Sequence, residues 1–163
     1  MSETESLVKI HVELPNHWAT GGESMWALPL GENRYQIRNT PFYAYNLNFL
    51  DIVIAASGNE DLKPEILSVV ERSGHQTIRV FFSAEIPQSN RIRLLESLNT
   101  LHTFFEQLSD SFFTLDIQPE CDYLGVRSIL DKWNSQDILD YETCEAKFAG
   151  SFDSLPEAEE SSR

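Results

Sequence analysis

Apolar and polar residues alternate along the first half of the chain in a way that is typical of strands. From Val8 to Leu14 every second residue is apolar, which predicts a strand with one buried face. The segments 25–30 and 35–38 flank Gly31-Glu32-Asn33 and predict a β-hairpin. Residues 51–56 are predicted to form a fourth strand. Short strands at such close spacing predict a small barrel or a strongly curved sheet.

The second half mixes strand and helix patterns. Residues 65–71 and 76–82 are predicted to pair as strands around Ser73-Gly74, and Ser89 is predicted to cap a helix that runs to about Asn99. The segment 101–108 fits either a continued helix or a strand over 103–107. We favour the strand, in a hairpin with residues 112–117.

Asp122 is predicted to be the N-cap of a helix over 124–133. Residues 138–144 are predicted to form the last strand, with Leu139 and Tyr141 facing inward and Asp140 and Glu142 facing outward. From Thr77 onward the order is strand, helix, hairpin, helix, strand, which predicts a ferredoxin-like βαββαβ sandwich. The expected fold class is therefore α+β, with a β-rich N-terminal half before this sandwich.

The expected domain organisation follows from these elements and from the polar ends of the chain. We predict a flexible N-terminus over 1–6, a β-rich subdomain over 7–64 and a ferredoxin-like subdomain over 65–149 packed on it. The remainder, 150–163, is polar and acidic and is predicted to be disordered.

Net charge is the strongest compositional signal. The chain has 26 acidic and 12 basic residues, a net charge of -14, and 13 of the acids fall within residues 110–163. Such a field repels nucleic acid and anionic membranes and attracts basic proteins. The chain has neither an apolar run of the ~20 residues that span a membrane nor a signal-like start, and it has two cysteines. We therefore expect a cytoplasmic protein.

The sequence lacks the common motifs of catalysis and of metal or cofactor binding. It has no glycine-rich phosphate loop, no G-x-S-x-G, no C-x-x-C and no H-E-x-x-H, and its four histidines are scattered. We expect no catalytic residues, no metal and no cofactor. The polar cluster Glu71–His75 can be an acid/base or anion-binding turn, or a structural turn in which Gly74 takes positive φ. We favour the structural turn.

Acidic residues on ordered elements of the second half are the candidates for binding a basic partner. They can dock such a protein, or they can form a solvated face that only maintains solubility. Trp18, in a polar loop, is a candidate anchor, whereas Trp26 and Trp133 lie on apolar stripes and are expected in the core. The predicted partner-binding residues are Glu120, Asp122, Asp137, Asp140, Glu142, Glu145 and Trp18.

Three stretches resemble a bacterial family known only as domain of unknown function 4265. They are residues 23–37, residues 40–53 and residues 70–80, and the last contains Glu-Arg-Ser-Gly-His-Gln-Thr-Ile-Arg-Val from Glu71 to Val80. The resemblance covers about Leu7 to Cys144. It supports the strand over 103–107 and implies no activity. Small acidic domains of this sort are often associated with bacterial toxins as immunity proteins.

These observations favour an acidic cytoplasmic binding protein that is not an enzyme. The most concrete form is an immunity protein that occludes the basic active site of a toxin, such as a nuclease. An alternative is a regulatory domain that binds a small molecule through the aromatic first half and the turn from Arg72 to His75. A third hypothesis is a hydrolase or transferase that uses His75 with Glu71.

Overall fold

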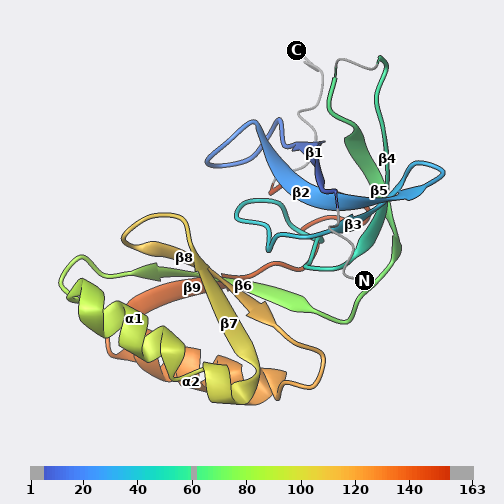
Figure 1. Cartoon of the computed structure of the whole chain (residues 1–163). Coiled ribbons are helices and arrows are strands. Elements are labelled where there is room, and N and C mark those ends of the chain that lie inside the picture. The colour runs from blue at the N-terminus through green and yellow to red at the C-terminus, as the bar shows by residue number, and fades with distance from the viewer. Residues whose placement is uncertain (1–5, 60–61, 155–163) are drawn as a thin grey trace, which may run out of the picture. The chain divides into compact units, whose positions relative to one another are not determined.

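The chain folds into two compact units of the α+β class (Figure 1). The computed structural model describes residues 6–59 and 62–154. The first unit comprises Met1–Ser73 together with Glu145–Arg163, and the second comprises Gly74–Cys144. The boundary between the β-rich and the ferredoxin-like subdomains was predicted at residue 64. The structure places it at Ser73, because the strand that begins at Glu65 belongs to the first unit.

Five strands form the first unit and close into a barrel. They are β1 (Val8–Glu13), β2 (Gly22–Gly31), β3 (Arg34–Ile37), β4 (Ile52–Ala56) and β5 (Glu65–Glu71). Consecutive strands pair antiparallel, while β1 and β5 meet in parallel and close the ring. Inward-facing residues fill the interior, among them Ile10, Val12, Met25, Ala27, Ile37, Val53 and Ile66. Of the two expected forms, a small barrel or a strongly curved sheet, the structure shows the barrel.

The prediction that residues 65–71 pair with residues 76–82 is wrong. The first of these segments, β5, lies between β4 and β1 in the barrel, whereas β6 (Gln76–Phe82) lies between two strands of the second unit. Proximity in sequence suggested a hairpin. The pairing partner of a strand, however, depends on which other edges are available, and this is a property of the whole sheet.

The second unit packs two helices on one face of a four-stranded sheet. After β6 come α1 (Gln88–Glu96), the short 3-10 helix Asn99–Leu101, β7 (Thr103–Gln107), β8 (Phe112–Ile117), α2 (Tyr123–Ser135) and β9 (Leu139–Thr143). The sheet order is β7-β8-β6-β9 and every pair is antiparallel. Ile78, Val80, Leu95 and Leu130 belong to one buried cluster, so both helices cover the same face. The strand over 103–107 is confirmed.

The two helix starts differ in how well they were predicted. Asp122 is the N-cap of α2, as expected, and its Oδ1 accepts a hydrogen bond from the Gly125 N–H at 3.1 Å. The prediction of Ser89 as a cap is wrong, because Pro87 holds the N-cap position of α1 and Ser89 lies inside the helix. Proline suits a helix start because it has no N–H to satisfy there.

Two further expectations are corrected. Trp26 was expected in the core, but it is 43% exposed because Met25 and Ala27 on either side point inward. The Lys9 ammonium lies 4.6 Å from the centre of the Trp26 ring. Trp133 does pack against the core of its unit, as a partly buried residue.

The start of the C-terminal segment that was predicted to be disordered is part of the barrel unit. Phe152 packs against the barrel core and Asp153 is buried. The Tyr45 N–H donates to the Phe152 carbonyl at 2.9 Å, and the Asn16 N–H donates to Asp153 Oδ2 at 2.8 Å. The rest of that prediction, residues 155–163, and residues 1–5 of the predicted flexible N-terminus lie outside the described residues.

Candidate functional site

Three of the predicted partner-binding acids lie at the two ends of α2. Glu120 and Asp122 precede the helix, and Asp137 follows it. A helix of 13 residues is about 20 Å long, so these acids do not form one patch. The Asp122 carboxylate already caps the helix, and Glu120 Oε1 lies 3.9 Å from His102 Nδ1.

The two acids on β9 alternate with Leu139 and Tyr141, which belong to the core of the second unit, and both acids have partners within this unit. The Asn134 side-chain amide donates to Asp140 Oδ1 at 2.7 Å. The Arg79 guanidinium donates to Glu142 Oε2 at 3.2 Å, and Arg79 is fully buried. A buried arginine requires an opposite charge close by. The Glu142 carboxylate therefore neutralises Arg79.

Trp18 and Glu145 belong to the first unit, so the predicted set is divided between the two units. Glu145 is exposed, and the Trp18 side chain is 55% exposed. The Trp18 indole N–H donates to the Tyr45 hydroxyl at 3.2 Å, and its ring meets Tyr43 edge-on with centroids 6.5 Å apart. Its backbone N–H donates to Ser154 Oγ at 3.2 Å. These contacts fix the orientation of a half-exposed tryptophan.

Polar contacts around Trp18 hold the neighbouring loop. The Glu23 carboxylate accepts hydrogen bonds from the backbone N–H groups of Phe42, Tyr43 and Ala44 at 2.7, 3.0 and 2.9 Å. His17 Nδ1 accepts from the Ala19 N–H at 2.9 Å, so its Nε2 carries the proton that it donates to the Tyr43 carbonyl at 3.0 Å. We call His17, Trp18, Tyr43 and Tyr45 the Trp18 cluster.

Within the barrel unit, a buried carboxylate accepts hydrogen bonds from Arg72 and Ser73. Asp51, which is fully buried, accepts hydrogen bonds from Arg72 Nη1 at 3.2 Å and from the Ser73 N–H at 2.9 Å. Arg72 Nη1 also donates to the Asn46 carbonyl at 2.8 Å. These contacts explain Arg72 and Ser73 as structural residues. Gly74 has φ +94°, as predicted, although it does not lie in a hairpin.

His75 has its carboxylate partner within the second unit. Its Nδ1 lies 2.7 Å from Asp116 Oδ1, and both side chains are largely buried. Burial raises the pKa of the Asp116 carboxyl above its ordinary value, while the hydrogen bond from His75 acts in the opposite direction. Glu71, the partner in the hydrolase hypothesis, lies on β5 in the other unit.

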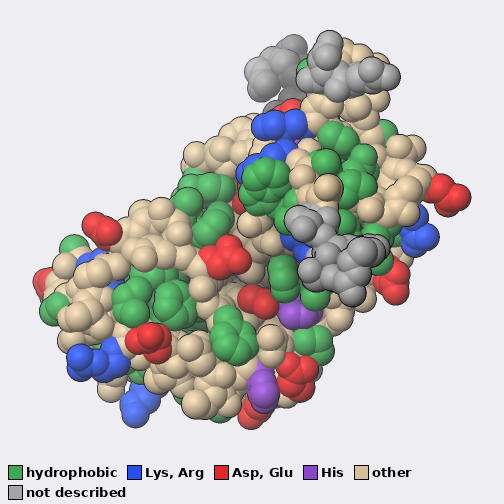
Figure 2. Space-filling view, viewed as in Figure 1, with side chains coloured by type: hydrophobic (Ala, Val, Ile, Leu, Met, Phe, Trp, Pro, Cys, Tyr) green, Lys and Arg blue, Asp and Glu red, His purple; other side chains and the backbone are tan. Residues whose placement is uncertain are grey.

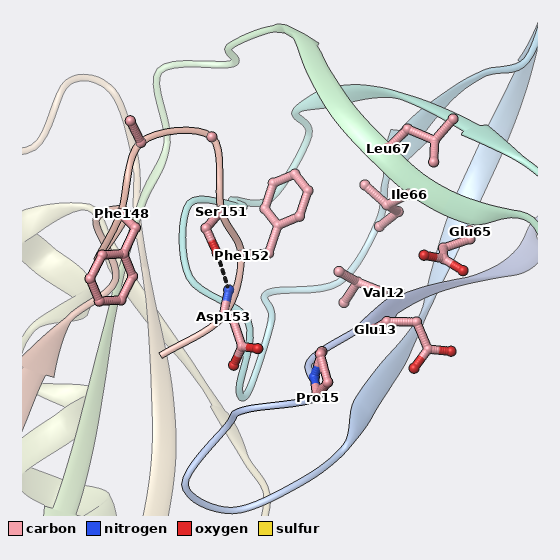
Figure 3. A pocket seen from close by; sticks show the side chains of 12 residues that line it. Val12, Glu13, Pro15, Glu65, Ile66, Leu67, Phe148, Ser151, Phe152 and Asp153 are labelled. Atoms are coloured by element: carbon pink, nitrogen blue, oxygen red, sulfur yellow. Dashed lines mark hydrogen bonds between the residues drawn. The ribbon is translucent and has the colours of Figure 1, made fainter. Parts of the chain in front are cut away.

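The first unit also has a groove that was not expected from the sequence (Figure 3). Its volume is about 590 Å³. It lies between the end of β1 and the start of β5, and the segment 148–153 forms a further wall. We call it the β1–β5 groove and define it by Val12, Glu13, Pro15, Glu65, Ile66, Leu67 and residues 148–153.

Three segments far apart in the sequence make up this groove, which is why local patterns did not reveal it. The adjacent apolar residues 66–67 and 69–70 break the alternation of β5 and were the one available signal. Val12 and Ile66 are buried, whereas Glu13, Glu65 and Phe148 are exposed. The groove therefore combines an apolar floor with acidic side chains.

The described residues contain neither a candidate metal site nor a helix that could span a membrane. Within 6–59 and 62–154, no three His, Cys, Asp or Glu side chains come together in a way that could hold a metal ion. In the same ranges, no helix has the length and apolar character needed to cross a membrane.

Comparison with known proteins gives a fold and a family. A solved structure of a hypothetical protein from Neisseria gonorrhoeae matches 91% of this chain and 100% of its own, with a TM-score of 0.72 and 17% identity, which indicates a shared fold. No curated protein matches the chain. The model of one family matches residues 23–141, somewhat less than the resemblance over Leu7 to Cys144 suggested. The chain therefore belongs to the family described as Domain of unknown function (DUF4265).

Proposed function

We propose that this protein is an acidic binding protein that recognises a basic partner protein, and that it acts as an immunity protein against a toxin. The observation that carries the proposal is the Trp18 cluster. A tryptophan that is 55% exposed and held by its neighbours offers a large apolar contact at little entropic cost. Tryptophans of this kind are enriched among the residues that dominate binding energy.

The charge of both units supports a basic partner. Residues 1–73 and 145–163 contain 15 acidic and 7 basic residues, and residues 74–144 contain 11 and 5. On the face shown in Figure 2, acidic side chains are scattered among uncharged ones. A field of this kind speeds association with a basic surface and disfavours nucleic acid and anionic membranes.

The mechanism that we propose is occlusion in the cytoplasm without catalysis. Trp18 inserts into the substrate-binding surface of the toxin, and the acidic side chains steer the encounter. Among the predicted acids, Asp137 and Glu120 are better suited to contact a partner than Asp122 and Glu142. The carboxylates of Asp122 and Glu142 already cap α2 and neutralise Arg79, respectively.

Co-expression with the product of the neighbouring gene, followed by co-purification at rising salt, tests this function. We expect a complex that weakens as salt increases. Trp18→Ala should weaken it about 30-fold, the value for a loss of about 2 kcal/mol. Trp26→Ala is the matched control, because Trp26 is similarly exposed but lies outside the Trp18 cluster. Failure of the wild-type protein to bind a basic partner at low ionic strength would reject the function.

A regulatory domain that binds a small molecule is the second candidate. The volume of the β1–β5 groove favours it, since ligand sites commonly measure about 300–1,000 Å³. A bound metabolite should raise the melting temperature in a thermal-shift panel. A broad panel without a hit would count against this candidate.

For the second unit we infer a ferredoxin-like arrangement. The element order from β6 to β9 and the sheet order β7-β8-β6-β9 support it, as does the placement of both helices on one face. An experimental structure in which β6 and β8 are not the central strands would contradict it.

A further inference from the structure

We propose that the β1–β5 groove binds an extended, basic and apolar segment of the partner protein, which adds to the barrel as a strand. The proposal rests on the proposed function, because it assumes that the partner is a basic protein. Four features carry it: the short pairing of the two strands, a bulge in β5 at Leu67, an apolar floor and the lack of basic side chains among the described lining residues.

The seam between β1 and β5 is much less extensively paired than the rest of the barrel. The two strands share the single register pair His11↔Glu65, and the His11 N–H donates to the Pro64 carbonyl at 2.9 Å. By comparison, β1 and β2 share six register pairs. Within the described residues, the strands continue past His11 and Glu65 into the groove without further pairing. An edge of this kind is where an extended peptide can add as a strand.

Two bulges in β5 expose apolar side chains, and one of them lies in the groove. Along β4, Ala55 pairs with Ile66 while its neighbour Ile54 pairs with Ser68, so the pairing skips Leu67. In the same way it skips Val70. A bulge bends its strand and turns the extra residue away from the regular alternation. Leu67 and Val70 are accordingly 57% and 45% exposed, and Leu67 lines the groove.

The floor and far wall of the groove are apolar. Val12 and Ile66 are buried beneath it, and Phe152 packs on the same core. Phe148, on the far wall, is 40% exposed. In Figure 3, Phe152 extends between the ribbon of the C-terminal segment and β5. This surface suits an apolar side chain of the bound segment.

The charge of the lining selects a basic segment. Among the described residues, the lining contains Glu13, Glu65 and Asp153 and has no Lys or Arg. Asp153 is buried and accepts hydrogen bonds from backbone N–H groups of Asn16 and Ser154. Glu13 and Glu65 are exposed and lie on neighbouring strands (Figure 3), with His11 Nε2 3.3 Å from Glu13 Oε1. Lysine or arginine side chains can reach these two carboxylates while the apolar side chains face the floor.

An added strand also fits the features of the groove better than a small molecule does. Side chains of a strand alternate between two faces, which matches a groove that is apolar below and acidic at its rim. Main-chain hydrogen bonds to the groove edge would supply affinity, and side-chain contacts with Leu67 and the apolar floor would supply specificity. A small amine would use the carboxylates and leave the strand edge unused.

The test uses a fluorescent, capped heptapeptide in which Lys alternates with Val, and fluorescence anisotropy with the full chain. We expect saturable binding that weakens with salt. Glu13→Gln/Glu65→Gln should weaken it about tenfold and reduce the salt dependence. Glu32→Gln/Glu96→Gln, which removes the same charge at exposed positions outside the groove lining, should leave it unchanged. Leu67→Ala should weaken binding, whereas Leu124→Ala, also exposed, should not.

Two modified probes separate strand addition from the alternatives. Two versions of the peptide are made, in which one or the other alternate set of backbone amides is N-methylated. Only the version that loses the N–H groups facing the groove edge should lose binding, because methylation removes these donors. Equal binding of both N-methylated versions, or of benzylamine at the same site, would identify a small-cation site and overturn the proposal. Failure of the parent peptide to bind at low salt would also overturn the proposal.

Failure of this inference can be distinguished from failure of the proposed function. If the neighbouring gene product binds the wild type and Glu13→Gln/Glu65→Gln equally well, the groove is not its docking site and the proposed function stands. If the peptide binds in the groove but the gene product does not bind the wild type, the proposed function fails and the groove remains a peptide site.

Discussion

At the scale of single residues, buried carboxylates explain the most characteristic part of the sequence. Asp51 is fully buried and accepts hydrogen bonds from Arg72, Ser73 and Asn48. The Arg-Ser pair of the family-like string therefore serves to satisfy one carboxylate in the barrel unit. The arginine of this string is engaged by Asp51 and Asn46, which explains its presence without a bound anion.

Asp51→Ala should destabilise the barrel unit by about 3 kcal/mol, because it leaves two backbone N–H groups and a guanidinium without their acceptor. Urea unfolding followed by tryptophan fluorescence measures the change, since Trp18 and Trp26 both lie in this unit. Asp110→Ala, at an exposed position of the second unit, should have little effect. Equal stability of the two variants would contradict the structural role of Asp51.

Asp116 predicts a pH dependence of stability. Burial raises the pKa of its carboxyl above the ordinary value of 3.8, so the folded state retains a proton that the unfolded chain releases. The contribution of Asp116 to stability should therefore fall as pH rises from about 3.8 through the folded-state pKa. Asp116→Asn removes this dependence, so its stability relative to the wild type should rise with pH across that window. Urea unfolding at a series of pH values tests it, and parallel pH profiles would contradict it.

At the scale of elements, one acid that was predicted to bind a partner has a structural task. Asp122 was predicted both as the cap of a helix and as a partner-binding residue, and its carboxylate accepts the Gly125 N–H. The cap could be recognised from the sequence because it depends on residues within a single helical turn. Whether Asp122 also contacts a partner remains a prediction.

Asp122→Ala should destabilise the second unit by about 1 kcal/mol, the usual cost of losing a cap. Asp122→Asn retains an oxygen acceptor and should recover most of that loss, although it removes the charge. Fluorescence of Trp133, which lies on α2, follows the unfolding of this unit. If the asparagine variant is as unstable as the alanine variant, the charge rather than the hydrogen bond stabilises the helix.

At the scale of the whole molecule, the chain leaves the barrel unit at Ser73 and returns to it at Glu145. The returning segment packs Phe152 on the barrel core and forms one wall of the β1–β5 groove. The acidic tail predicted from composition therefore begins as part of the folded unit. The low average hydrophobicity of the tail did not reveal that Phe152 packs on the barrel core.

Phe152→Ala should destabilise the barrel unit by about 2 kcal/mol, less than a fully buried phenylalanine, because Phe152 is partly exposed. Phe148→Ala is the control, since Phe148 is 40% exposed and is not among the residues packed on the barrel core. Denaturation with separate fluorescence readouts for Trp18 and Trp133 should show the loss in the first unit. Equal effects of the two substitutions would place Phe152 outside the core.

Features that depend on neighbouring residues could be predicted without the three-dimensional structure. Alternation predicted the strands, Gly31-Glu32-Asn33 predicted the β2–β3 hairpin, and Asp122 predicted the start of α2. Composition predicted an acidic protein, and the order of the predicted strands and helices predicted the α+β class. These signals are local because strand alternation, turns and caps are set within a few residues.

Features that join distant residues could not be predicted from local patterns and are seen in the folded chain. The fold placed β5 beside β1 in the barrel, Phe152 on the barrel core and Glu142 beside the buried Arg79. It also formed the β1–β5 groove from three separate segments. The physical reason is that a strand edge, a core contact or a buried charge requires a partner, and the identity of the partner depends on which other groups the closed sheets leave available.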